Sequence, residues 1–171
     1  MSDHWWQHAV VYQVYVRSYA DGDGDGLGDL AGLRRRLDHI AALGVDAIWL
    51  CPIYPSPQRD HGYDVADYVD IEPAYGDLAD FDALVADAGA RGVRVLLDVV
   101  PNHCSDQHPW FQDALRAGPG SDERARFWFR PGRDGGGPPN NWPAAFGGSV
   151  WTAVGGDDPE WYLGTFTPYQ P

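Results

Sequence analysis

The chain has 171 residues and a formal net charge of −13, and every one of its 12 basic side chains is an arginine. This acidity disfavours nucleic acid and anionic membranes as partners, because both are themselves negatively charged. One hydrophobic core is expected at this length, since a complete eight-stranded βα barrel needs about 250 residues. No stretch approaches about 18 apolar residues, so no membrane span is predicted. The N-terminus shows no basic and apolar leader, so we expect no signal peptide and a cytoplasmic protein.

The first part of the chain alternates between strand and helix patterns. Runs of β-branched, aromatic and aliphatic side chains predict strands at residues 10–16 and 45–50 and from Val93 onward. Apolar residues at three- and four-residue steps predict a helix from about Gly28 to Leu43 and another from about Ala79 to Ala90. This order, with right-handed crossovers, predicts the opening of a parallel α/β layer or barrel.

Several helix details follow from the same pattern. Gly44 is expected to cap the first helix, and Gly92 to end the second. The side chains of the second helix that we expect to face inward are Leu78, Phe81, Leu84, Val85 and Ala88.

The run from Val93 to His103 carries the clearest functional signal. Its apolar first half predicts a strand buried on both faces, as parallel sheets require. The strand runs into Asp98, Asn102 and His103, and polar groups at the carboxyl ends of such strands are where binding and catalysis concentrate.

Residues 104–171 differ in composition and periodicity from the preceding part. They hold most of the tryptophans and many prolines, with little sustained periodicity, so an irregular segment is expected. The two cysteines, Cys51 and Cys104, follow predicted neighbouring strands. A disulfide between them is geometrically conceivable, but we expect buried free thiols.

Two motifs together resemble a known family. Asp60-His-Gly-Tyr63-Asp64 and Asp98-Val-Val-Pro-Asn-His103 resemble a signature of the α-amylase superfamily, glycoside hydrolase family 13. The resemblance implies the α/β class: residues 1–103 would form the N-terminal portion of a (β/α)8 TIM barrel, with strands 1–3 and helices 1–2. Residues 104–171 would begin the irregular domain B insertion, and the whole chain would be an N-terminal fragment.

The resemblance also implies a site for an α-linked gluco-oligosaccharide substrate. The counterparts of Asp60, Tyr63 and His103 line the pocket for the non-reducing-end glucose, and the counterpart of Phe146 borders the next subsite. The counterpart of Asp98 organises the pocket, and that of Asn102 supports its loop. Taken singly, each has a structural alternative: a histidine after a strand, a loop-bracing aspartate, or an aromatic in a small core of its own.

An acidic loop follows the first predicted strand. In Asp21-Gly-Asp23-Gly-Asp25-Gly26-Leu27-Gly-Asp29, carboxylates alternate and Gly26 permits a sharp turn, which suits a hard cation. The loop resembles the cation loop of oligo-1,6-glucosidase-type members, which implies structural Ca²⁺, or Mg²⁺. The implied ligands are Asp21, Asp23, Asp25, the Leu27 carbonyl and Asp29. The alternative is a solvated acidic turn with Asp29 at a helix N-terminus.

In this family the nucleophile, the acid/base and a third carboxylate follow barrel strands four, five and seven. No segment resembles them, so we expect no catalytic residue in this chain and no glycosidase activity from it alone. The intact parent would be a retaining α-glucosidase, which the Tyr54-Pro-Ser-Pro57 segment favours. Trehalose synthases and isomerases share these segments, and a non-catalytic carbohydrate-binding protein is a further alternative. A doubly wound hydrolase is disfavoured, because no phosphate loop or nucleophile elbow is present.

Overall fold

The computed structural model describes residues 4–171 and divides into two compact units. The N-terminal unit comprises the residues up to Pro55 together with Tyr68–Val99, and the C-terminal unit comprises Ser56–Asp67 and Val100–Pro171. The loop 56–67 therefore groups with the later part of the chain, whereas the sequence pattern assigned all of residues 1–103 to one part. The expectation about a leader rests partly on residues 1–3, which lie outside the described residues.

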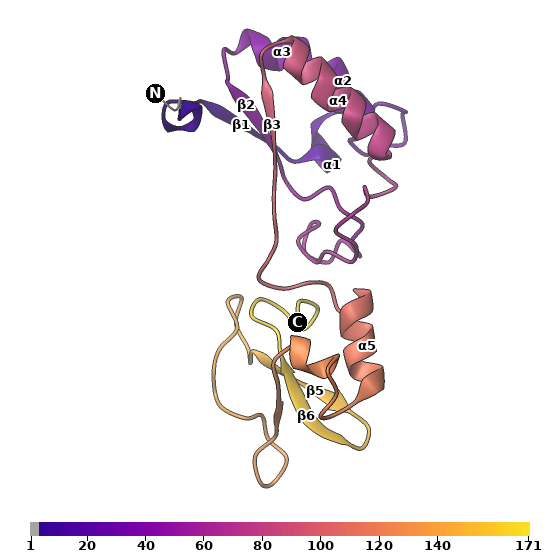
Figure 1. Ribbon diagram of the computed structural model, residues 1–171, viewed down its shortest axis with the longest axis vertical. Helices are drawn as coiled ribbons and strands as arrows, with labels where there is room; N and C mark the ends of the chain where they lie inside the picture. Colours follow the sequence, from indigo (N-terminus) through magenta and orange to yellow (C-terminus); the bar gives the residue numbers. More distant parts are fainter. Residues whose placement is uncertain (1–3) are drawn as a thin grey trace. The chain divides into compact units, whose positions relative to one another are not determined.

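A parallel sheet forms the centre of the N-terminal unit. Its strands are β1 (Val11–Val14), β2 (Ala47–Leu50) and β3 (Arg94–Leu97), in the order β1-β2-β3. The helices α2 (Leu30–Arg35), α3 (Leu37–Ala42) and α4 (Leu78–Ala90) connect the strands and lie together on one side of the sheet (Figure 1). The short elements η1 (Trp5–Gln7) and α1 (Val16–Tyr19) flank β1. The predicted order of strands and helices is confirmed.

The core of this unit lies between the sheet and the helices. Leu33, Leu37 and Ile40 from the helices and Ile48 and Leu50 from the central strand are fully buried in one cluster. Apolar burial of this kind stabilises a fold by roughly 1.5–3 kcal/mol for each large side chain. The cluster fixes the sheet against the helices and so fixes where each strand ends.

The predicted first helix is two helices. Its residues form α2 and α3, which meet at Arg36, where φ is −100° and ψ is 2°. The Arg36 N–H donates to the carbonyl of Leu33, a three-residue step that tightens the turn. The apolar stripe continues across the break, because Leu33, Leu37 and Ile40 are all buried. Gly44 has a φ of 76°, in keeping with its predicted role after the helix.

Two burial expectations were wrong. Leu78 and Val85 in α4 are 52% and 41% exposed, because Leu84 and Ala88 lie on the face that meets the sheet and Phe81 packs beside them. The strand β3 is not buried on both faces: Leu96 and Leu97 are 36% and 39% exposed. Among the described residues β3 pairs only with β2, so it is an edge strand, and Val95 is its side chain packed against the core.

The C-terminal unit is more regular than its sequence suggested. It contains α5 (Pro109–Ala117), η2 (Arg124–Arg126) and an antiparallel sheet of β4 (Phe129–Pro131), β6 (Asp158–Leu163) and β5 (Trp151–Gly155), in that order. Phe111 of α5 makes ring contacts with Phe129 and Tyr162 of the sheet at centroid distances of 6.1 and 5.0 Å. These aromatic contacts form the core of the unit.

Both cysteines are free and buried, as predicted. Burial raises the pKa of the Cys104 thiol to about 12, and the Asp106 carboxylate adds to this rise, so the thiol stays protonated at neutral pH. Within residues 4–171, none of the helices has the length and apolar character that crossing a membrane requires.

Candidate functional site

The loop 56–64 of the C-terminal unit is held by one buried carboxylate. Asp64 is fully buried and accepts hydrogen bonds from the Ser56 hydroxyl at 2.8 Å, the Arg59 backbone N–H at 3.0 Å and the Asp60 backbone N–H at 3.1 Å. A buried charge persists only when hydrogen bonds of this kind replace its water. Asp64 therefore fixes the backbone from which the Asp60 side chain projects.

Gln170 joins two of the predicted sugar-binding residues. Its side chain is fully buried, and its Nε2 donates to Asp60 Oδ2 at 2.7 Å and lies 3.2 Å from His103 Nε2. The Thr167 hydroxyl donates to Gln170 Oε1 at 2.9 Å, which points the amide nitrogen towards the carboxylate. A carboxylate, an amide and an imidazole therefore meet at one point of the C-terminal unit.

His103 is neutral in this setting. Its Nε2 lies 3.1 Å from the Tyr63 carbonyl, and the Asn102 amide nitrogen lies 3.1 Å from its Nδ1. With a proton on Nε2 the ring donates to Tyr63, and without one it accepts from Gln170. Burial lowers the pKa of His103, while the Tyr63 carbonyl and the charges of nearby carboxylates oppose this shift.

Aromatic rings extend the cluster on one side. The Phe166 ring lies 5.2 Å from the His103 ring and 5.7 Å from the Phe146 ring, measured between centroids. The Ala145 backbone N–H donates to the Thr165 carbonyl at 2.9 Å, and this bond holds the Phe146 loop beside Phe166. Phe146 itself is 69% exposed, so its ring face is available to a ligand and does not close a small core of its own.

Asp98 belongs to the N-terminal unit. Its backbone N–H donates to the Leu50 carbonyl at 3.2 Å, and its carbonyl accepts from the Tyr54 hydroxyl at 2.9 Å. Burial raises the pKa of Tyr54, and the Asp98 charge adds to that rise. The C-terminal unit thus holds five of the predicted sugar-site residues: Asp60, Tyr63, Asn102, His103 and Phe146. Asp98 lies in the other unit, where its backbone carbonyl accepts from Tyr54 in the loop after β2.

The lowered pKa of His103 predicts a pH dependence. A group with a folded pKa below its unfolded value contributes stability that is present above pH of about 6.5 and is lost as pH falls through the folded pKa. His108, whose pKa burial also lowers, contributes in the same direction. We expect urea denaturation to give a smaller unfolding free energy at acid pH than at pH 7.5. His103→Gln should reduce this pH dependence, and an unchanged dependence in that variant would contradict the role given to the ring.

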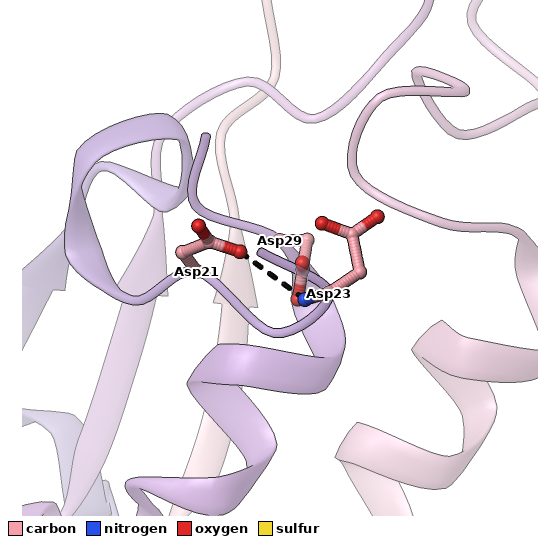
Figure 2. A group of neighbouring side chains, drawn as sticks. All are labelled: Asp21, Asp23 and Asp29. Atoms are coloured by element: carbon pink, nitrogen blue, oxygen red, sulfur yellow. Dashed lines mark hydrogen bonds between the residues drawn. The ribbon is translucent and has the colours of Figure 1, made fainter. Parts of the chain in front are cut away.

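The acidic loop after α1 brings three carboxylates together. Oxygen atoms of Asp21, Asp23 and Asp29 all lie within 4.8 Å of one another (Figure 2). Two oxygens bound to the same calcium ion, each at about 2.3–2.6 Å, can be separated by at most about 5 Å, so this spacing fits one ion. Hydrogen bonds from the backbone N–H groups of Gly24 and Gly26 lower the pKa of Asp21, so its carboxylate is charged at neutral pH.

Asp25 and Asp29 of the predicted ligand set differ in burial and in their hydrogen bonds. Asp25 is exposed and lies outside the group of three, and its Oδ1 accepts from the Leu27 backbone N–H at 2.7 Å. Asp29 is 8% exposed and caps α2, accepting from the Gly32 backbone N–H at 2.6 Å. Asp29 thus lies at the N-terminus of α2, and this position is compatible with a cation beside the same carboxylate.

Comparison with known proteins decides the family. A family model described as the catalytic domain of α-amylase matches residues 13–171. The chain belongs to the α-amylase family. The resemblance carried by the Asp60 and His103 motifs is confirmed, and so is the fold class, because the structural relatives are barrel enzymes whose N-terminal part this chain matches.

The relatives include an α-glucosidase, a trehalose-6-phosphate hydrolase and an isomaltulose synthase. An α-glucosidase of Culex pipiens is 49% identical over 170 residues, covering 98% of this chain and 28% of the relative. Trehalose-6-phosphate hydrolase of Escherichia coli is 50% identical over 167 residues, covering 98% and 30%. Isomaltulose synthase of Erwinia rhapontici superimposes with a TM-score of 0.93 at 44% identity, covering 100% of this chain and 30% of that one. The chain thus spans about 30% of the length of these relatives.

The sequence pattern missed Gln170, Thr167 and Phe166. Gln170 lies 110 residues from Asp60 in sequence, and nothing in its surroundings distinguishes it from a surface glutamine. One signal existed: the polar Thr167 hydroxyl, three residues before Gln170, forms a local hydrogen bond that orders the turn. That turn places the amide, but only the fold shows that it meets Asp60.

Proposed function

We propose that this chain supplies the glucose-binding part of the active site of a retaining α-glucosidase. The observation that supports this proposal most directly is the meeting of Asp60, His103 and Gln170 in one partly buried cluster, in which only Gln170 is fully buried. A pyranose ring presents hydroxyl groups that both donate and accept. Asp60 offers a carboxylate acceptor and His103 an imidazole that donates or accepts, while the buried Gln170 amide orients both. The exposed Phe146 ring offers a flat apolar surface for the sugar face.

The roles of these residues are binding and orientation. Asp60 Oδ1 would accept hydrogen bonds from sugar hydroxyls, while Gln170 donates to Asp60 Oδ2 and holds the carboxylate in place. Neutral His103 would donate to or accept from a neighbouring hydroxyl without adding charge. Retaining hydrolysis needs two further carboxyl groups about 5 Å apart across the scissile bond, and the family resemblance assigns neither to this chain. We therefore expect the 171-residue chain alone not to turn over a nitrophenyl α-glucoside.

Glucose titration followed by ¹H–¹⁵N NMR tests the binding role. We expect glucose to shift the signals of Asp60 and His103, with millimolar affinity, because a few hydrogen bonds to a small neutral ligand give about 4 kcal/mol. Asp60→Asn should weaken binding at least about tenfold, through loss of charge-assisted hydrogen bonds. Asp157→Asn, the same change at an exposed position of the C-terminal unit, is the matched control. Shifts that survive Asp60→Asn unchanged would refute this site.

Glucosyl isomerisation is the second candidate. Solved trehalulose synthase and isomaltulose synthase chains are 46% and 44% identical to this chain, as similar as the hydrolases are. Hydrolysis and isomerisation of a glucoside both require a bound glucosyl ring, and that is the step to which Asp60 and His103 are suited. A product assay on sucrose with a protein that contains this chain and the catalytic carboxylates would separate the two: free glucose and fructose indicate hydrolysis, and an isomeric disaccharide indicates transfer.

We also propose that the Asp21 loop binds calcium as a structural ion. Asp21, Asp23 and Asp29 would supply its carboxylate ligands, and the ion would neutralise their mutual repulsion and stiffen the turn before α2.

Calorimetric titration of the metal-stripped chain with Ca²⁺, and then with Mg²⁺, tests this proposal. We expect saturable Ca²⁺ binding and a higher melting temperature, since an ion at 100 times its dissociation constant stabilises the folded state by about 2.7 kcal/mol. Asp23→Asn should abolish most of the binding heat. Asp82→Asn removes one exposed carboxylate from α4 and should change neither quantity. Absence of saturable heat in the unmodified chain would overturn the proposal.

A further inference from the structure

A pocket lies in the C-terminal unit, and none of the residues that line it belongs to the sugar-binding cluster. It has a volume of about 650 Å³ and is lined mainly by β4, the segment that follows it, and the start of β5. Small-molecule sites commonly have volumes of about 300–1,000 Å³. The side chains that matter for its chemistry are Trp128, Arg130, Arg133, Asn140, Trp142 and Trp151.

Indole rings form the walls of this pocket. The Trp142 and Trp151 rings stack at a centroid distance of 6.5 Å and an interplanar angle of 24°. Asn140 Oδ1 fixes both, accepting from the Trp151 indole N–H at 2.8 Å and from the Trp142 backbone N–H at 3.0 Å. Trp142 and Trp128 are nevertheless 57% and 63% exposed. Asn140 therefore supports the exposed ring of Trp142, and Trp128 adds a second exposed indole, an arrangement typical of a binding surface.

The polar groups of the pocket are donors. Its lining contains two arginines and no aspartate or glutamate. Within the part of the chain that the structure describes, neither Arg130 nor Arg133 forms an ion pair with a carboxylate. Arg130 lies over the Trp128 ring, with 4.9 Å between its guanidinium carbon and the ring centroid. The Asn140 oxygen is already used, so its amide nitrogen adds a further donor.

A ligand for this pocket must accept hydrogen bonds and carry negative charge. The chain as a whole carries a formal charge of −13, so an indentation with two arginines and no acid is a local reversal of sign. The sugar-binding cluster differs, because it contains Asp60 and suits neutral hydroxyl groups. Arginine binds phosphate through paired N–H donors, and an indole face binds the C–H face of a pyranose.

We propose that this pocket binds a hexose phosphate, with the sugar ring on the exposed indole faces of Trp128 and Trp142 and the phosphate on Arg130 and Arg133. Because the chain belongs to the α-amylase family, a pyranose is the favoured group to bear the phosphate. The pocket goes beyond the proposed glucosidase function, because it is lined by none of the residues that would bind the glucosyl ring. It adds a site at which a charged sugar binds this chain.

Titration with glucose 6-phosphate, by calorimetry and by the indole ¹H–¹⁵N signals, tests the assignment. We expect the indole signals of Trp128 and Trp142 to shift. The double variant Arg130→Gln/Arg133→Gln should bind at least about tenfold more weakly, because it loses the charge-assisted hydrogen bonds to the phosphate. Trp128→Ala should weaken binding as well. These residues are exposed, so the variants should keep the amide spectrum of the folded chain.

Two controls separate this pocket from other effects. Arg126→Gln removes an arginine that lies over another exposed ring, Trp110, outside this pocket, and should leave binding unchanged. Asp60→Asn should also leave it unchanged, so failure of the glucose site and failure of this pocket are distinguishable. No binding at about 10 mM, a concentration that would reveal millimolar affinity, overturns the assignment. Equal affinity for glucose would also overturn it, because that indicates a neutral-sugar site. Equal affinity for inorganic phosphate would indicate a bare anion site, and tighter binding of adenosine monophosphate a nucleotide site; either result overturns the assignment.

Discussion

Replacing Gly32 by alanine is expected to destabilise the N-terminal unit by more than about 3 kcal/mol, because overpacking against a rigid backbone cannot relax. A Cβ atom at Gly32 would lie 2.0 Å from the Ala20 carbonyl oxygen and 3.0 Å from the Gly22 backbone nitrogen. Both neighbours are main-chain atoms at the start of the acidic loop, so α2 would have to move away from it. Urea denaturation followed by circular dichroism measures the loss. Because Asp29 caps α2 at Gly32, calcium binding should fall in the same variant.

Gly89→Ala is the matched control for that substitution. Gly89 also lies in a helix, α4, but a Cβ atom there would meet nothing within 4 Å. Alanine restricts the unfolded chain more than glycine does, so this variant should be neutral or more stable by up to about 1 kcal/mol. Equal loss of stability in the two variants would contradict contact with the loop as the cause of the Gly32 effect.

Asp64→Asn is expected to destabilise the C-terminal unit by about 2–4 kcal/mol, the range for removing a charge from a buried hydrogen-bonded network. The carboxylate accepts from three donors, at Ser56, Arg59 and Asp60. An asparagine of the same shape offers one acceptor oxygen and turns its own N–H₂ donors towards the remaining donors. The loop that presents Asp60 would lose its support, so glucose affinity should fall together with stability. Thermal unfolding and glucose titration of the same preparation measure both.

Two comparison variants make the Asp64 result interpretable. Ser56→Ala removes one of the three donors and should cost about 1 kcal/mol, a fraction of the Asp64 effect. Asp122→Asn makes the same chemical change at an exposed carboxylate of the same unit and should leave stability within about 0.5 kcal/mol. A small effect of Asp64→Asn, comparable with that of Asp122→Asn, would mean that the loop is fixed by other contacts.

The sheet and helices of the N-terminal unit were predictable, because their buried apolar residues recur at regular intervals in the local sequence. The stripe of Leu33, Leu37 and Ile40 identified the helical face even though the helix breaks at Arg36. The break was not predictable, because Arg36 is a good helix former and no glycine or proline follows it before Gly44. The exposure of β3 was missed for a related reason: a run of aliphatic side chains does not show which of its faces another element covers.

The candidate site divides in the same way. Asp60 and His103 were identifiable because each stands in a distinctive short motif, and the acidic loop because its carboxylates alternate. Gln170 and Phe166 were not, since their roles arise from contacts with residues 110 and 63 positions away in the chain. The helix α5 was also missed, although His108 and Pro109 supply a cap and a first-turn proline that are typical helix-start signals.

The placement of the loop 56–67 has a consequence for synthesis of the chain. This loop is fastened by the Ser105 N–H donating to the Val65 carbonyl at 2.7 Å, by the Arg59–Asp106 ion pair at 2.9 Å and by Gln170 on Asp60. During translation it leaves the ribosome before any of these partners. At 5–20 residues per second, the 110 residues between Asp60 and Gln170 take roughly 5–20 s to add. For that interval the Asp60 carboxylate has no amide to meet, so a nascent chain completes the sugar-binding cluster only once Gln170 has been added.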